Sequence, residues 1–399
     1  MDCQREVRDT QETMALAKLP ETSRIRLEYV DGIRALAALI VYLNHAYAQV
    51  STGGHVDLRS PWSWARCSMV IGHLSVTIFI VISGFCLTLP VVAQGGQLRG
   101  GVKGFLRRRA RRILPPYYAA VCLCLVLIWT VIGKPTGSLW DYPQRVDALA
   151  IISHLLLLQD LFATSRINYV FWSIAVEWHI YFIVPLLVLA WRRFGSTTVV
   201  IGCLALGYAV RLGLGDTRVA RMHPQFLGMF ALGMLAAYIV RSPDARFVRL
   251  KQNVPWTAVT SLLLLANVGL ISWWGIELAE TRFHWLDLPI GIMAAATLSA
   301  GASKPSGLIH RVFSWTPLVA VGTFSYSLYL IHAPLLQIMW QYALVPLGLS
   351  REASLSILLT IGFGLVVVLS YVFFRLFEAP FMGSAQASTI DKPQAEPAA

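Results

Sequence analysis

The stretch Val30-Asp31-Gly-Ile-Arg34-Ala-Leu-Ala-Ala-Leu-Ile-Val-Tyr-Leu-Asn-His45 is apolar along most of its length but carries a carboxylate, a guanidinium and an imidazole. At ~100° per residue, steps of three and of eleven positions return an α-helix to nearly the same face. Asp31, Arg34 and His45 therefore share one stripe of a helix that is long enough to cross a bilayer. Ionisable groups in such helices face a bundle interior or a wet cavity. The stretch predicts a membrane helix bordering a chamber where something polar binds or reacts.

The composition is that of a membrane protein with many spans. The chain has 399 residues, of which 56% are hydrophobic and 14% charged, and its mean hydropathy is +0.61. Soluble domains carry roughly 25% charged residues. The net charge of +12 does not indicate nucleic-acid binding, because Lys and Arg cluster in short segments between apolar runs. Residues 1–28 are polar and show no signal-peptide pattern.

Apolar runs of about 16–25 residues can cross the ~30 Å hydrocarbon layer. Ten such runs predict an all-α polytopic membrane fold with about ten transmembrane helices, at 30–50, 68–92, 114–133, 170–191, 198–213, 224–241, 256–274, 286–303, 317–345 and 354–377. The apolar stretch 148–162 is short and predicts an interfacial or re-entrant helix instead.

Basic residues predict the orientation. When the connecting segments are assigned alternately to two sides, 22 of the 33 Lys and Arg lie on the side of both termini and nine on the other. The positive-inside rule then places both termini in the cytoplasm. We expect a flexible cytoplasmic tail at 1–27, a membrane domain at 28–382 and a disordered cytoplasmic tail at 383–399, which is small, polar and contains Pro.

Three ionisable residues from separate predicted spans reach a similar depth. At ~1.5 Å per residue, His45 and His332 each lie about 22 Å from the cytoplasmic face, and Glu177 lies about 20 Å from it. Arg34 lies about 16 Å closer to the cytoplasm than His45. An isolated intramembrane histidine can simply bond a backbone carbonyl, but the matching depths favour a functional site. His73 and His179 fit structural and functional roles equally well.

Five arginines stand in the segment Phe105-Leu-Arg-Arg-Arg109-Ala-Arg-Arg112-Ile-Leu-Pro115, before a predicted span. One interpretation is that they only anchor the topology of the chain. They can also form an anion site, because guanidinium groups bind phosphate bidentately and a helix start, here marked by Pro115, attracts anions. The six cysteines lack metal-ligand spacing, so we expect small buried side chains and no metal site.

Six motifs, in order and at similar spacing, resemble the acyltransferase-3 family of integral membrane acyltransferases over about residues 28–382. They are Asp31-Gly-Ile-Arg34 with His45, Ile80-Val-Ile-Ser83-Gly84-Phe85, Arg109-Ala-Arg-Arg112-Ile-Leu-Pro115, Trp172-Ser173-Ile-Ala-Val-Glu177 with Tyr181 and Pro185, Ser325-Tyr-Ser-Leu-Tyr329-Leu-Ile-His332, and Phe377-Glu378-Ala-Pro380-Phe381.

The resemblance implies ten spans, an acyl-coenzyme A co-substrate reached from the cytoplasm and no permanently bound cofactor. The acyl group, usually acetyl, passes to a hydroxyl of a glycan, a lipid-linked sugar or a small metabolite, in a protein of the bacterial inner membrane surrounded by lipid. The expected catalytic residues are His45, Glu177 and His332. The expected donor-binding residues are Arg34, Arg109, Arg112, Ser83 and Tyr329, and the expected supporting residues are Asp31, Trp172, Ser173 and Ser325.

Two positions depart from the family pattern. The family often has an Asp before the Ser83 motif, where this chain reads Val76-Thr77, and an acidic residue after Glu177, where this chain has Trp178. Some members also carry an extracytoplasmic hydrolase-like domain. This chain ends soon after its last predicted span, so a single transfer step is expected.

Transfer of an acyl group from a thioester to a hydroxyl requires a base and a stabiliser of the tetrahedral oxyanion. A histidine suits the first task, and Glu177 can orient the imidazole or accept a proton. The sequence pattern alone does not separate His45 from His332 as the base. Direct transfer is favoured because no serine or cysteine stands in a nucleophile motif. Two other classes remain open: a transporter or flippase with a buried substrate or proton path, and a b-type haem protein with paired histidines.

Overall fold

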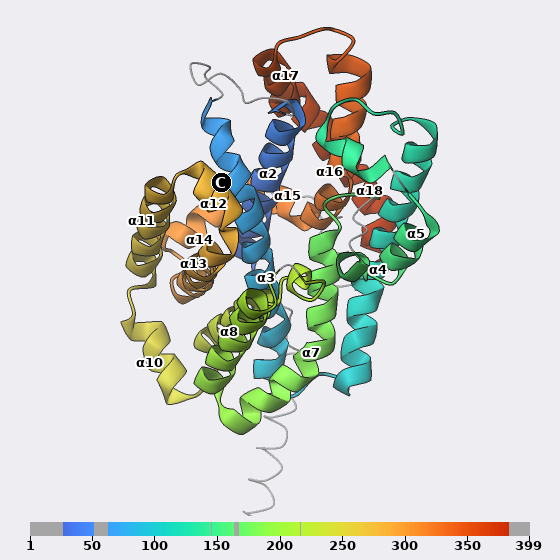
Figure 1. Ribbon diagram of the computed structural model, residues 1–399. Helices are drawn as coiled ribbons and strands as arrows, with labels where there is room; N and C mark the ends of the chain where they lie inside the picture. Colours follow the sequence, from blue (N-terminus) through green and yellow to red (C-terminus); the bar gives the residue numbers. More distant parts are fainter. Residues whose placement is uncertain (1–26, 52–62, 145, 163–166, 216, 383–399) are drawn as a thin grey trace, which may run out of the picture.

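The described part of the chain is built from helices and contains no β-strand (Figure 1). This computed structural model describes residues 27–51, 63–144, 146–162, 167–215 and 217–382. The predicted all-α membrane fold is therefore confirmed. The two predicted tails, 1–27 and 383–399, lie outside the described residues except for Leu27.

The longer helices are α2 (Glu28–Ser51), α3 (Ser68–Ala93), α4 (Gly101–Thr130), α7 (Trp172–Phe194), α8 (Ser196–Gly213), α9 (Phe226–Arg241), α11 (Trp256–Trp274), α13 (Phe283–Ser303), α16 (Ser325–Met339) and α18 (Phe363–Phe373). Shorter α-helices are α5 (Ala148–Leu155), α6 (Gln159–Phe162), α10 (Ala245–Asn253), α12 (Ile276–Thr281), α14 (Leu308–Phe313), α15 (Thr316–Thr323) and α17 (Arg351–Ile357). Single turns of 3₁₀- or π-helix are η1 (Ser63–Cys67), η2 (Leu139–Gln144), η3 (Ala220–Met222), η4 (Trp340–Leu344), η5 (Leu358–Gly362), η6 (Phe374–Glu378) and η7 (Ala379–Phe381).

Eight helical segments of the described chain are long and apolar enough to cross a membrane. They are Trp64–Ala93, Gly101–Thr130, Trp172–Phe194, Ser196–Gly213, Ala220–Arg241, Trp256–Trp274, Phe283–Ser303 and Arg351–Phe381. A bent pair, Thr316–Thr323 with Ser325–Leu344, makes a ninth. The first predicted span corresponds to α2, a helix of 24 residues whose polar stripe keeps it out of this set. The stretch 148–162 forms only α5 and α6, as its length predicted.

The prediction of one straight ninth span over 317–345 is wrong. The helix axis turns by 74° between α15 and α16. Gly322 lies directly against the backbone carbonyl of Asp31, where any Cβ would overlap that oxygen. The hydroxyl of Ser325 donates to the Gly322 carbonyl across the break, at 3.0 Å. Close packing of α15 on α2 therefore redirects the chain, and a depth for His332 counted from residue 317 does not hold.

The prediction that Pro115 marks the start of a helix is also wrong. Helix α4 begins at Gly101, and Pro115 and Pro116 lie inside it. The Arg, Leu and Ala residues before the prolines are good helix formers, and membrane helices tolerate proline where other groups satisfy the freed backbone. The hydroxyl of Tyr326 donates to the Ile113 carbonyl at 3.2 Å and ties α16 to α4 at this point. The arginines of this segment are thus helical residues and not a loop at a helix start.

Cysteine burial was only partly predicted. Cys124 and Cys203 are buried, whereas Cys67 and Cys122 are exposed and Cys86 is half-buried. Cys122 and Cys124 point to different sides of α4, because positions two apart on a helix lie on different faces. Among the described residues, no group of three or more His, Cys, Asp or Glu is placed to hold a metal ion.

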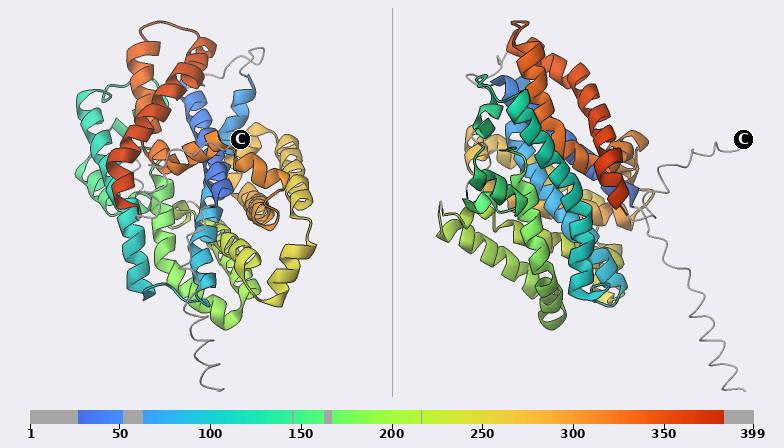
Figure 2. Two further views of the ribbon diagram at one scale, coloured as in Figure 1. Left: turned by 180° about the vertical axis from the view of Figure 1, so that it is seen from behind. Right: turned by 90° about the vertical axis from the view of Figure 1, so that its right-hand side faces the viewer.

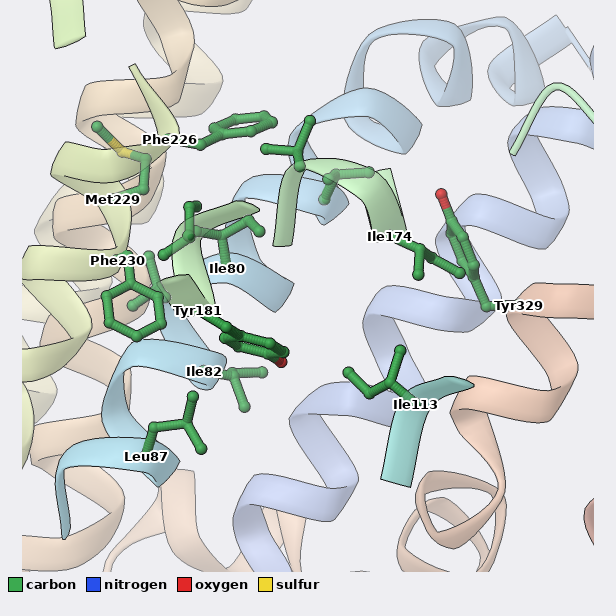
Figure 3. Packing of buried hydrophobic residues seen from close by; sticks show 14 of the residues in the cluster. Ile80, Ile82, Leu87, Ile113, Ile174, Tyr181, Phe226, Met229, Phe230 and Tyr329 are labelled. Atoms are coloured by element: carbon green, nitrogen blue, oxygen red, sulfur yellow. The ribbon is translucent and has the colours of Figure 1, made fainter. Parts of the chain in front are cut away.

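Helices α2 and α3 run through the middle of the bundle, with α11 and α13 on one side and α4, α16 and α18 on the other (Figures 1 and 2). Helix α3 packs most extensively on α9. Gly84 faces the carbonyl of Phe230, and Gly233 faces that of Val81, so the backbones touch at both points. Around this contact lies the apolar core shown in Figure 3, including Ile80, Phe226 and Tyr181.

We expect Gly84→Ala to destabilise the protein, because the added Cβ would overlap the Phe230 backbone carbonyl. Overpacking of this kind costs about 1–3 kcal/mol. The control is Gly202→Ala in α8, where a Cβ meets no atom within 4 Å. The measurement is the melting temperature of the purified variants in detergent. Equal melting temperatures for the two variants would show that the α3–α9 contact is looser than described.

Candidate active site

His45 of α2 and His332 of α16 form a hydrogen-bonded pair, which we call the histidine pair. Nδ1 of His45 lies 2.7 Å from Nε2 of His332. The two rings are stacked, with centroids 5.0 Å apart and an interplanar angle of 12°. The sequence analysis expected His45 and His332 at a similar depth. In the structure the two side chains are in direct contact.

The neighbours of His332 determine the tautomers of the neutral pair. Nδ1 of His332 lies 3.1 Å from the carbonyl of Leu328 and 2.9 Å from that of Tyr329. Because both partners only accept, this nitrogen carries the proton and Nε2 of His332 is the acceptor. Nδ1 of His45 must then donate to His332. The remaining nitrogen of His45, Nε2, then carries a lone pair, and within the described residues it makes no hydrogen bond.

A cavity of about 400 Å³ opens beside the histidine pair. His45 lines it, while His332 is wholly buried behind it. The cavity is lined by Val41, Asn44, His45, Ala48, Met69, Gly72, His73, Val76, Leu139, Tyr169, Trp172 and Tyr329. Of the two histidines of the pair, only His45 can therefore meet a molecule bound in this cavity.

Tyr169 is a cavity residue that the sequence analysis did not identify. Its ring packs edge-on against His45, with centroids 4.9 Å apart. Its hydroxyl is buried and has no hydrogen-bond partner in the described part of the chain. A tyrosine between two predicted spans carries no sequence signal of this role. The fold alone brings it to the cavity.

Gln49 and Gln337 form a polar network about one helical turn from the histidine pair, and the sequence analysis did not identify either of them. Gln49 Nε2 donates to Gln337 Oε1 at 2.8 Å, and Ser138 Oγ donates to the same oxygen at 2.8 Å. Gln337 Nε2 donates to Thr136 Oγ1 at 3.0 Å. The network ties α2, α16 and the segment before η2 together. Gln49 stands four residues after His45, on the same helix face, and this spacing was the available signal.

Four residues that the resemblance singled out lie near the break in α15–α16 or at the cavity. The hydroxyl of Tyr329 lies 2.7 Å from Ser173 Oγ and donates to the Val170 carbonyl at 3.0 Å. Trp172 lines the cavity and stacks on His73. Ser325 caps the break. Tyr329, expected at the donor site, thus lies at the cavity with the histidine pair.

The predicted arginines gather around Cys86 of α3, and we call Arg34, Arg109 and Arg112 the arginine cluster. Arg34 Nη1 donates to Asp31 Oδ1 at 3.2 Å, and its Nη2 lies 3.4 Å from Cys86 Sγ. Arg109 and Arg112 act electrostatically on the same thiol. Helical spacing selects these members of the run, because residues 107 and 111 are exposed on the opposite face of α4.

Glu177 of α7 lies within electrostatic reach of the arginine cluster and of Tyr329 at the cavity. It interacts electrostatically with Arg34 and Arg109, and with Tyr181 one turn along α7. Within the described residues it makes no hydrogen bond or ion pair with His45 or His332.

Ser83, a predicted donor-binding residue, lies in α3 with its hydroxyl 3.4 Å from that of Tyr181. It thus faces the arginine cluster. Glu378, from the closing motif, is buried, accepts from Ser327 Oγ at 2.7 Å and interacts electrostatically with Arg112. The two sets of polar groups define two levels, the arginine cluster at one and the histidine pair with its cavity at the other.

Asp160 of α6 is a buried carboxyl outside the membrane-spanning helices. Its side chain is 6% exposed, and Oδ2 has no hydrogen-bond partner among the described residues. Burial raises the pKa of Asp160 to about 8. Desolvation without a compensating cation has this effect on a carboxyl group.

These features describe an all-helical, polytopic integral membrane protein with a buried histidine pair at a cavity. Residues 27–375 match the acyltransferase-3 family, described as an acyltransferase domain. The chain therefore belongs to this family. No solved structure matches the chain.

Several curated bacterial proteins are similar to the chain. The O-acetyltransferase OatA of Staphylococcus aureus is 26% identical over 327 residues, covering 77% of this chain and 50% of that protein. The peptidoglycan O-acetyltransferase OatA of Listeria monocytogenes is 23% identical over 348 residues, covering 80% and 51%. The putative peptidoglycan O-acetyltransferase YrhL of Bacillus subtilis is 26% identical over 327 residues, covering 77% and 48%. The chain thus spans about half the length of the curated relatives it matches.

We expect Asp160→Asn to stabilise the protein at pH 8 more than at pH 5. The folded state holds the Asp160 proton up to about pH 8, whereas the unfolded state releases it near 4. Between these values the folded state binds more protons, so stability falls as pH rises. Melting temperatures of wild type and variant, measured from pH 5 to 8, should diverge with rising pH. A constant difference would show that the carboxyl is not buried as described.

Proposed function

We propose that this protein is an O-acyltransferase that moves an acetyl group from acetyl-coenzyme A to a hydroxyl of a saccharide acceptor, with His45 as the general base. The observation that supports this most is the directed hydrogen bond of the histidine pair. It leaves the Nε2 lone pair of His45 available at the wall of the 400 Å³ cavity. Family membership and the names of the relatives support the reaction class.

In this proposal the acceptor hydroxyl enters the cavity and passes its proton to His45 Nε2 as its oxygen attacks the thioester carbonyl. The tetrahedral intermediate collapses, the carbon–sulfur bond breaks and the coenzyme A thiolate leaves. His332 is a positioning residue, because it accepts from His45 Nδ1 and holds the imidazole while it gains a proton. The unpartnered hydroxyl of Tyr169 is the candidate donor to the developing oxyanion.

The arginine cluster is the proposed site for the coenzyme A phosphates. Arg34 and His45 lie about 16 Å apart along α2. The flexible pantetheine arm of coenzyme A likewise separates the phosphates from the thioester. Glu177 lies among these arginines, so its role is to orient guanidinium groups rather than the imidazole.

The sides of the membrane follow from the distribution of charge. The proposed topology keeps both termini and the arginine cluster toward the cytoplasm of a bacterial inner membrane, as the excess of basic residues favours. The histidine pair and its cavity then lie toward the outer side. The names of the relatives make a peptidoglycan saccharide the first acceptor to test. Other glycans, lipid-linked sugars and small hydroxylated metabolites follow.

We expect His45→Ala to lower kcat by about 10²–10⁴-fold, the usual loss for a general base, in a protein that remains folded and membrane-inserted. Tyr169→Phe should lower kcat by about 10²–10³-fold if its hydroxyl stabilises the oxyanion. His332→Gln should retain more activity than His332→Ala, because the amide oxygen can still accept from His45. Acetyl transfer by purified protein measures all four. His45→Ala activity within threefold of wild type would exclude His45 as the base.

We expect the double variant Arg109→Gln/Arg112→Gln to raise the KM for acetyl-coenzyme A more than it lowers kcat, because phosphate contacts persist from ground state to transition state. The single variant Glu177→Gln should also raise the KM for acetyl-coenzyme A. Arg107→Gln, on the exposed face of the same helix, is the matched control. An unchanged KM for acetyl-coenzyme A in the double variant would show that Arg109 and Arg112 do not bind the donor and serve only the topology.

A further inference from the structure

A second polar cluster adjoins Trp172 and shares His73 with the cavity. We call it the outer cluster, and its members are His73 of α3, Arg211 of α8, His223 before α9, and His284 and Asp287 of α13. The ring of His223 lies 4.6 Å from that of Trp172 and 6.0 Å from that of His73. Arg211 acts electrostatically on all three histidines. The proposed transfer reaction uses none of these five residues.

Four nitrogens of the outer cluster are buried without a hydrogen-bond partner in the described part of the chain. They are His73 Nε2, Arg211 Nε, His223 Nδ1 and His284 Nδ1. A buried polar atom left unpaired costs about 1–3 kcal/mol, and native proteins rarely leave several together without a ligand or water. Each of these nitrogens is a donor or becomes one by choice of tautomer.

The one carboxylate of the cluster does not meet this need. Asp287 is wholly buried, and it accepts from Thr77 Oγ1 at 2.5 Å and from Gln225 Nε2 at 3.2 Å. Both of its oxygens are therefore satisfied by neutral groups. Asp287 fixes α3 and the turn before α9. It acts electrostatically on Arg211, but within the described residues it accepts no hydrogen bond from Arg211 or the histidines.

The backbone at His223 is held in an unusual conformation. Its φ of +52° lies in the left-handed region, which non-glycine residues seldom adopt. Such a conformation persists where the surrounding structure imposes it, and it recurs at ligand sites. Here it turns the imidazole toward Trp172 and His73.

The outer cluster reaches the cavity through His73. Gly72 of α3 lies directly against the side chain of Asn44 of α2, so the two helices touch there. His45 follows Asn44 in α2, and His73 follows Gly72 in α3. Both histidines line the cavity. A molecule in the cavity with its reacting hydroxyl at His45 can thus present another group to His73 and the donors behind it.

We propose that the outer cluster is an anion subsite of the acceptor, in which His73, Arg211 and His223 bind a carboxylate or phosphate group carried by the acetylated molecule. An anion accepts several hydrogen bonds at once, and charge-assisted bonds to a guanidinium are the strongest of these. This inference rests on the proposed function for its choice of substrate. Carboxylated sugars and phosphorylated or lipid-diphosphate-linked sugars are the two sources of such an anion.

The test measures binding and does not need turnover. Calorimetric titration of the purified full chain uses D-galacturonate, inorganic phosphate and the neutral methyl galactoside. It is done in the Arg109→Gln/Arg112→Gln background, so that anions bound by the arginine cluster do not contribute. Arg211→Gln is the test variant, and Arg211→Lys retains the charge in case the first variant folds poorly. Arg218→Gln, exposed seven residues along the chain, is the control.

We expect at least one anion to bind and Arg211→Gln to weaken it by at least about tenfold, the loss of one charge-assisted hydrogen bond. Arg211→Lys should weaken it less, and Arg218→Gln should stay within twofold. Preference for galacturonate assigns a carboxylate, and preference for phosphate assigns a phosphoryl group.

Anion affinity that does not change in Arg211→Gln, or neutral and anionic probes that bind equally, would overturn the subsite. Acetyl transfer is assayed separately on proteins that keep Arg109 and Arg112, with and without Arg211→Gln. If the proposed function is wrong, acetyl transfer is absent while anion binding is intact. If the subsite is wrong, acetyl transfer is intact while anion binding is absent or independent of Arg211.

Discussion

The hydrogen bond between His45 Nδ1 and His332 Nε2 joins two helices whose residues stand 287 positions apart in the chain. In hydrocarbon no water is available to satisfy an imidazole, so polar groups of spanning helices must satisfy one another or face a cavity. His332 uses its other nitrogen on the carbonyls of Leu328 and Tyr329, and this gives the pair a direction. One histidine orients, and the other is left with a lone pair at the cavity wall.

The rest of the bundle holds this pair in place. Helix α2 packs on α3, α15 and α16, and its contact with α15 requires Gly322 against the Asp31 backbone. The same end of α2 carries Arg34 into the arginine cluster. A single helix thereby links the proposed phosphate site to the proposed base. The outer cluster adds a third polar region, reached through His73 on the neighbouring helix.

Much of this arrangement could be predicted from the sequence, and the failures have physical causes. Helical periodicity placed Asp31, Arg34 and His45 on one face, and hydropathy located the long helices. The break at Phe324 depends on how α15 packs on α2, which is not a local property of the chain. Pro115 resembles a helix start in the sequence, but the good helix formers before it extend α4 back to Gly101. Depths counted along the helices placed Glu177 level with the histidines, but within the described residues it makes no hydrogen bond with either of them.

The most direct test of the account is acetyl transfer across a sealed membrane. Purified protein is reconstituted into proteoliposomes, with acetyl-labelled coenzyme A supplied to one face and a peptidoglycan saccharide to the other. The account predicts that label reaches the acceptor hydroxyl only when the donor meets the face of the arginine cluster, with free coenzyme A released in equal amount. No labelled acceptor from either orientation, with the protein folded and inserted, would contradict it.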